Sequence, residues 1–207
     1  MATRNSSGSG AKNKIVAMLK ADHKKVKQAF KEFEKMDPEE DPQGCQQLVE
    51  KTLAEIEVHA ELEEQMFYPA ARGAIDEEDL IDEAEVEHMT AKVLIGQLKS
   101  MGPEDEKYAA TFKVLGEYLQ HHIEEEEGEI FKKISQSGAE WDTVLEEMQT
   151  QREQLMQEKG LPAEGEEAEG SRSSRSGASA RGGARSGGAE DRPQAASRSP
   201  KSSSRKE

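Results

Sequence analysis

The chain has 207 residues, of which 34% are charged, and its formal net charge is -15 at pH 7. This length allows one domain of ordinary size together with extensions. Aromatic residues make up only 4% of the chain, and runs of β-branched and aromatic residues, which are typical of strands, hardly occur. The composition therefore argues against a fold rich in β-strands.

Cys45 is the single cysteine, so the sequence excludes an internal disulfide and any CxxC zinc pattern. The first ten residues lack the apolar core of a secretory signal. No apolar run approaches the roughly 18–20 residues that span a bilayer. We therefore expect a cytoplasmic protein in a reducing compartment, with no membrane partner.

Charge is distributed unevenly along the chain. Residues 171–207 contain nine Lys or Arg against three Asp or Glu, a net charge of +6, which leaves -21 for residues 1–170. An acidic body is poorly suited to binding nucleic acid. We therefore expect nucleic acid as a partner only weakly, and only through the basic tail.

Four helices are predicted from apolar residues that recur at steps of three and four along the chain. The first covers roughly residues 12–36 and the second roughly 44–71, separated by the helix-breaking sequence DPEEDPQG. The third covers roughly residues 77–101, and the sequence MGP separates it from the fourth, at roughly 104–136. Four helices with short connections imply an all-α fold, an antiparallel up-and-down four-helix bundle.

A fifth helix is predicted from about residue 139 to about residue 159, with Trp141 near its start. We expect this C-terminal helix to dock on the outside of the bundle with Trp141 as its anchor. Beyond it the composition falls to Ser, Arg, Gly and Ala, which cannot bury enough apolar surface to offset chain entropy. The sequence therefore predicts one domain over 12–160, between a disordered N-terminus over 1–11 and a disordered tail over 161–207.

One histidine lies on the apolar stripe near the middle of each of the four helices: His23, His59, His88 and His122. In an up-and-down bundle, this spacing brings all four to a similar level of the interior. HAELEE at 59–64 and HIEEEE at 122–127 share the pattern H-x-x-x-E-E. Glu63 and Glu126 therefore lie one turn beyond a histidine and on the same helical face.

Burying two carboxylates without partners is prohibitively costly. A pair of cations removes this cost, because each carboxylate can bridge two ions while the histidines fill terminal positions. Mixed imidazole and carboxylate ligands suit iron, and zinc or manganese could also bind. Each residue alone would be read as a hydrogen-bonded core histidine or a surface ion pair. The conjunction of four histidines and two glutamates favours a metal centre.

The neighbours of these residues are expected to be less important. His121 is rotated by about 100° from His122, so we expect it at the surface or the edge. Glu64 and Glu127 lie beside the stripe and could support the ligands, but we expect them to be solvated. Tyr118 lies one turn before His122 and belongs either to the core or to the surroundings of the metals. Three further glutamates are expected to face solvent: Glu124, Glu125 and Glu129.

These residues carry a resemblance to the hemerythrin-like, or HHE cation-binding, family, which covers about residues 12–160. The resemblance rests on ADHKKV (21–26), HAELEEQMFYPA (59–70), EVEHMTAKV (85–93) and HHIEEEEGEIFKKI (121–134). It implies a four-helix bundle that holds a non-haem di-iron centre, with two oxo- and carboxylate-bridged iron ions. The ligands that it implies, with the two glutamates bridging, are His23, His59, Glu63, His88, His122 and Glu126.

The chain departs from the oxygen-carrying hemerythrins at two positions. The carriers have a second histidine one turn after the ligand of the third helix, where this chain has Lys92. On the fourth helix they use an aspartate five residues after the histidine, where this chain has Glu126 at the fourth. One imidazole fewer leaves an open coordination position, which favours turnover over reversible carriage.

Three functions are consistent with this sequence. The first is a di-iron protein that binds or senses dioxygen, nitric oxide or peroxide, or that handles iron. The second is a di-iron enzyme that removes peroxide or nitric oxide at the same site. The third is a non-catalytic interaction module that uses the basic tail.

Overall fold

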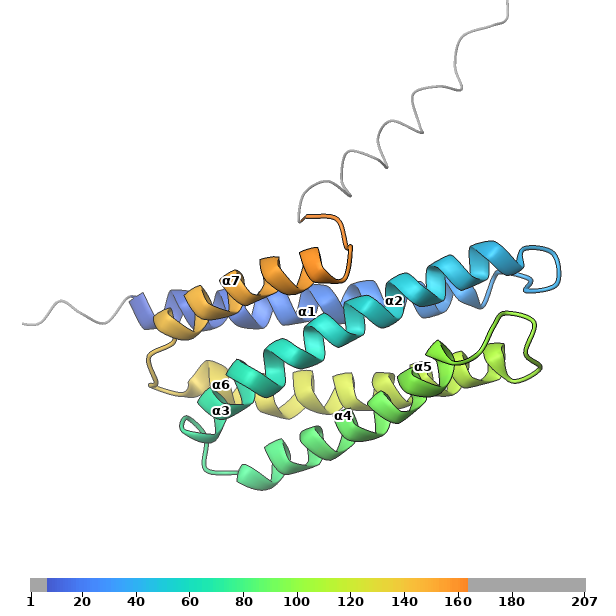
Figure 1. Ribbon diagram of the computed structural model, residues 1–207. Coiled ribbons are helices and arrows are strands. Elements are labelled where there is room, and N and C mark those ends of the chain that lie inside the picture. The colour runs from blue at the N-terminus through green and yellow to red at the C-terminus, as the bar shows by residue number, and fades with distance from the viewer. Residues whose placement is uncertain (1–6, 164–207) are drawn as a thin grey trace, which may run out of the picture. The chain divides into compact units, whose positions relative to one another are not determined.

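The computed structural model describes residues 7–163, and these residues form helices and their connections without any strand (Figure 1). The bundle is built from four long helical rods. Two of them are single helices, α1 (Ser7–Phe33) and α4 (Glu78–Lys99). The other two rods each contain a π-helical segment. They are α2 (Pro42–Leu62), η1 (Glu63–Phe67) and α3 (Tyr68–Arg72), and α5 (Tyr108–Glu125), η2 (Glu126–Ile130) and α6 (Phe131–Gln136).

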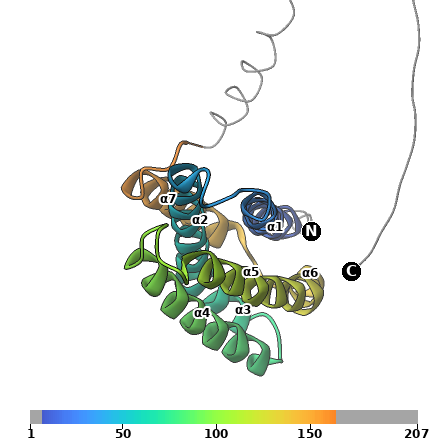
Figure 2. The ribbon, with the colours of Figure 1, turned by 90° about the vertical axis from the view of Figure 1, so that its right-hand side faces the viewer.

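The rods run alternately up and down, so that neighbours along the chain are also neighbours in space. Helix α1 contacts α2, α2 contacts α4, α4 contacts α5, and α5 returns to α1. Figure 2 shows this arrangement nearly end on, with α7 (Asp142–Glu158) on the outside. Helix α7 packs against α1 and α2. The predicted all-α bundle with a fifth C-terminal helix is confirmed.

The helical bundle begins and ends slightly outside the bounds that we predicted for the domain. Helix α1 begins at Ser7, and the buried Ala11 extends its apolar face by one turn. At the other end, Gly160 adopts a positive φ of 69° that terminates α7, and Leu161 packs against the core. The rest of the predicted tail and residues 1–6 lie outside the described residues.

The core consists of two apolar clusters with a polar layer between them. On α1, Ile15 and Leu19 belong to one cluster, and Val26 and Phe33 belong to the other. His23 lies between the two clusters and is itself buried. Trp141, in the first cluster, is also buried, as expected for the anchor of α7. The fold therefore places a histidine layer inside the bundle, with apolar packing above and below it.

The two helices that carry the H-x-x-x-E pattern switch from α to π geometry at the glutamate itself. The Tyr68 N–H bonds to the Glu63 carbonyl, and the Phe131 N–H bonds to the Glu126 carbonyl, so each bond spans five residues. An extra residue in one turn rotates the following side chains by about 100°. The π turns therefore lie within two of the predicted helices, and turns of this kind are frequent at functional sites.

An aromatic residue directly follows each π turn and contacts the histidine layer. The Tyr68 ring lies 5.4 Å from the His88 ring, measured between centroids. The Phe131 ring stacks on His23 at 5.8 Å with an interplanar angle of 7°. The two π turns therefore shape the layer symmetrically, one on each half of the bundle.

Candidate metal centre

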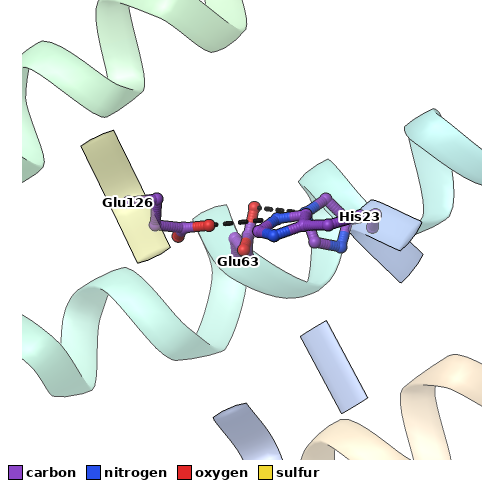
Figure 3. Close-up of side chains that lie close together, drawn as sticks. His23, Glu63 and Glu126 are labelled. Carbon is purple, nitrogen blue, oxygen red and sulfur yellow. Dashed lines mark hydrogen bonds and ion pairs between the residues drawn. The ribbon is translucent and has the colours of Figure 1, made fainter. Parts of the chain in front are cut away.

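The six predicted residues converge in the polar layer, and none is more than 7% exposed. Figure 3 shows His23, Glu63 and Glu126 pointing toward one another from three different helical segments. The side chains form two overlapping groups, in which the potential ligand atoms lie within 4.8 Å of one another. The first contains His23, His59, Glu63 and Glu126, and the second contains Glu63, His88 and His122.

The four histidines form two pairs through their Nε2 atoms. The Nε2 atoms of His23 and His59 are 3.1 Å apart, and so are those of His88 and His122. Glu63 joins the pairs, because its Oε2 lies 3.1 Å from His59 Nε2 and 3.5 Å from His88 Nε2. The geometry therefore provides two adjacent groups of donor atoms that share a carboxylate.

Glu126 approaches the first pair from the opposite side, with its Oε2 3.2 Å from His23 Nε2. Burial and the nearby Glu63 carboxylate raise the pKa of Glu126, so the metal-free site resists carrying both negative charges. Within the described residues, all four oxygens of Glu63 and Glu126 are buried and lack a hydrogen-bond partner. Buried carboxylates normally have such partners.

Each imidazole turns its other nitrogen, Nδ1, toward a carboxylate of the protein. A hydrogen bond that Nδ1 donates to a carboxylate fixes the ring and leaves the Nε2 lone pair directed at the centre of the site. Three such hydrogen bonds join His23 to Glu127 at 3.0 Å, His88 to Glu64 at 3.0 Å and His122 to Glu87 at 2.7 Å. His59 Nδ1 lies 3.5 Å from Asp22 Oδ2 and is paired with it by charge, without a hydrogen bond.

The expectation that Glu64 and Glu127 are solvated is therefore wrong. Both are only partly exposed, at 28% of the side chain, because each reaches across to a histidine of a neighbouring helix. The bond to His88, against opposing burial and with help from Lys92, lowers the pKa of Glu64 to about 2. A charged Glu64 is the state that accepts a hydrogen bond from His88 Nδ1.

Helix α7 also reaches the site through a buried ion pair. Arg152 donates from both terminal nitrogens to Asp22, at 2.7 and 2.6 Å. Burial acts to raise the pKa of Asp22, but the contacts with His59 and Arg152 outweigh it and lower the pKa well below its usual range. Arg152 thus holds Asp22 charged beside His59.

The donor set fits a pair of metal ions. Two buried carboxylates without protein donors face four imidazole nitrogens, whose lone pairs point at one another across 3.1 Å when each Nδ1 carries the proton. Cations between these atoms would satisfy both the lone pairs and the carboxylates. Nitrogen and carboxylate ligands without thiolate suit iron, manganese or zinc.

Tyr68, rather than Tyr118, brings a hydroxyl to the site. The fully buried Tyr68 places its oxygen 3.4 Å from His88 Nε2, and burial raises its pKa well above the usual value. Tyr118 is half-buried on α5. His121 is exposed, as expected.

A cleft of about 310 Å³ opens onto the histidine layer between α2 and α4. All four histidines line it, together with apolar side chains that include Ile56 and Ile95. Its charged lining residues include Lys92, which pairs with Glu64, and Lys159, which pairs with Glu57. The site is therefore buried in the bundle but accessible to a small molecule.

Residues 14–134 match the sequence profile of the Hemerythrin HHE cation binding domain. Among curated proteins, the chain is 28% identical over 137 residues to a DNA nickase from Nostoc sp.. The aligned part covers 62% of this chain and 37% of that relative, so the chain spans little more than a third of the relative's length.

Among solved structures, the fold is similar to the crystal structure of a hemerythrin HHE cation binding domain-containing protein from Mycobacterium kansasii. The TM-score is 0.56 at 21% sequence identity, and the match covers 69% of this chain and 85% of that chain. At this identity, the likeness supports the fold alone. No helix among residues 7–163 is long and apolar enough to cross a membrane.

Proposed function

The chain belongs to the hemerythrin HHE cation-binding family, and we propose that it is a non-haem di-iron protein that binds or senses dioxygen, nitric oxide or peroxide. One observation carries the proposal. The buried Glu63 and Glu126 have four carboxylate oxygens without protein donors, and they face two pairs of histidine Nε2 atoms. We further propose a cytoplasmic location, which suits the free and buried Cys45.

In this proposal, the six predicted residues would hold the iron pair, with Glu63 and Glu126 as its carboxylate ligands. The bound irons would supply electrons and an open position for a small ligand. Glu127, Glu64 and Glu87 accept hydrogen bonds from the Nδ1 atoms of His23, His88 and His122, so Nε2 is the atom that each of these rings would offer to the metals. The Tyr68 hydroxyl lies 3.4 Å from His88 Nε2 and could donate a hydrogen bond to a small ligand bound there.

The cleft between α2 and α4 would admit the ligand. Apolar side chains, including Ile56, Ala91 and Ile95, line part of this cleft and suit an uncharged diatomic ligand. Lys92 stands where oxygen carriers have a further histidine, but here its ammonium group pairs with Glu64. Lys92 therefore supports the orientation of His88 and does not act as a ligand.

The observation on Lys92 favours turnover as a second candidate function. One imidazole fewer than in the carriers leaves more room for a substrate at the metals. We would mix reduced, iron-loaded protein with hydrogen peroxide or nitric oxide and count the turnovers. Several turnovers per site, lost in the variant His59→Ala, would identify an enzyme. A single stoichiometric reaction would identify a binding or sensing protein.

Similarity to the Nostoc protein, which is named a DNA nickase, raises DNA strand cleavage as a further candidate. The acidic body argues against it, since residues 1–170 carry a net charge of -21. Conversion of supercoiled plasmid to the nicked form tests it, with a chelator and the His59→Ala variant as controls.

The predicted interaction module depends on the basic tail, which lies outside the described residues. Deletion of 164–207 tests this function, with nucleic-acid retention measured at varied salt.

A further inference from the structure

A second, smaller cleft reaches the same polar layer between α4 and the end of α5. It has a volume of about 40 Å³, and it opens onto the inner residues His122 and Glu126. Its nine lining residues include five glutamates and neither lysine nor arginine: Leu80, Glu83, Ala84, Glu87, His122, Glu125, Glu126, Glu129 and Ile130. The larger cleft, by contrast, is lined in part by Lys92 and Lys159.

The mouth of this acidic cleft carries a third group of potential metal ligands, Glu87, His121 and Glu125. His121 Nε2 lies 3.3 Å from Glu125 Oε1 and 3.9 Å from Glu87 Oε1. The side chains of His121 and Glu125 are 62% and 42% exposed, whereas that of Glu87 is only 10% exposed. The group therefore extends from solvent into the protein.

Glu87 links this outer group to the inner site. While its Oε1 faces His121, its Oε2 accepts a hydrogen bond from His122 Nδ1 at 2.7 Å. At the inner end of the cleft lies Glu126, which is 1% exposed and has no hydrogen-bond partner on either oxygen. An unsatisfied buried carboxylate at the end of an acidic cleft is an attractive position for a cation.

The size and charge of the cleft determine which ligands can enter it. A volume of about 40 Å³ is enough to hold a water molecule or a small ion. A concave surface lined by one sign of charge concentrates ions of the opposite sign and raises their association rate by about 10- to 1,000-fold. Imidazole together with carboxylate suits divalent transition metals.

We propose that this cleft is the entry path for ferrous iron and similar divalent cations, with Glu87, His121 and Glu125 forming a transient outer site. The cation binds there first and then passes inward to Glu126. Glu125 and Glu129 both line the cleft, and His121 lies one turn before Glu125 on α5 and pairs with it, so we call these three residues the ladder. The inference rests on the proposed di-iron function and adds a separate route for the metal.

The test measures how fast metal-free protein takes up ferrous iron without oxygen, using a coloured ferrous chelator to trap iron that is still unbound. The double variant Glu125→Gln/Glu129→Gln and the single variant His121→Ala remove the ladder. We expect loading to slow by about tenfold, with the same final iron content and the same melting temperature. The matched control is Glu117→Gln/Glu124→Gln, which removes the same charge from α5 outside the cleft.

Loading of the ladder variants at the rate of the control variant would overturn the entry path. A lower final iron content in the ladder variants would also overturn it, because these residues would then be ligands of the final site. The two proposals fail separately. If the unaltered protein retains no iron, the proposed di-iron function is wrong, whereas iron retention with equal loading rates refutes only the entry path.

Discussion

The substitution Arg152→Met tests whether helix α7 supports the metal site through Asp22. Both side chains of this ion pair are less than 10% exposed. Removing the arginine would leave the Asp22 carboxylate buried beside His59 without its two guanidinium donors. Breaking a buried pair in this way costs about 3–5 kcal/mol. For a body of this size, the melting temperature of the metal-free protein should fall by roughly 6–20 °C.

The same substitution should also weaken metal binding. Asp22 lies 3.5 Å from His59 Nδ1, and loss of a carboxylate or of its support behind a metal-binding histidine typically lowers affinity by about 10- to 100-fold. The double variant Asp22→Asn/Arg152→Met should recover most of the stability, since no charge is left buried and unpaired. It should not recover the affinity, because the negative charge behind His59 is still missing.

Thermal unfolding followed by circular dichroism, and metal titration against a competing chelator, measure the two effects. Arg72→Met is the control, because Arg72 pairs with Asp82 and Glu85 at the surface, where an ion pair contributes little to stability. If Arg152→Met costs no more than the control and leaves metal affinity unchanged, the reasoning about α7 is refuted.

Three further predictions address the site directly. His59→Ala or Glu126→Ala should lower iron content in metal analysis, whereas His121→Ala should leave the final content unchanged; equal losses in all three would show that our assignment of the inner face is wrong. Tyr68→Phe should retain iron but change the rate of reaction with peroxide in stopped-flow absorption. An unaltered rate would show that the Tyr68 hydroxyl has no role in the reaction. Burial lowers the pKa of His59, but Glu63 and Asp22 outweigh it and raise that pKa well above its usual value. Metal must therefore displace a proton, so affinity in pH-dependent titrations should rise with pH and fall in acid; affinity independent of pH would contradict this.

Helical periodicity was sufficient to predict the inner residues. His23, His59, His88 and His122 each lie on an apolar stripe, and a step of four puts Glu63 and Glu126 on the same face as their histidines. This prediction depends only on the geometry within one helix and on the alternation of four helices. The structure accordingly brings all six together.

The supporting residues could not be predicted in the same way, because their contacts cross between helices. Glutamates beside an apolar stripe are typical of the solvent-exposed face of a helix. Only the packing of neighbouring helices brings Glu64 to His88 and Glu127 to His23. Tyr68 could not be predicted to face the site either, because the π turn before it adds one residue and so changes which side chain faces inward. For Asp22 the only signal was its position beside His23 in ADHKKV.

The central claim is that the polar layer holds two iron ions, and the most direct test is metal analysis of the purified protein together with its absorption spectrum in air. We predict about two irons per chain and the absorption band of an oxo-bridged pair. Iron content and the band should be lost together in Glu63→Ala. A protein that contains no metal, and whose melting temperature is unchanged by a chelator, would contradict the account.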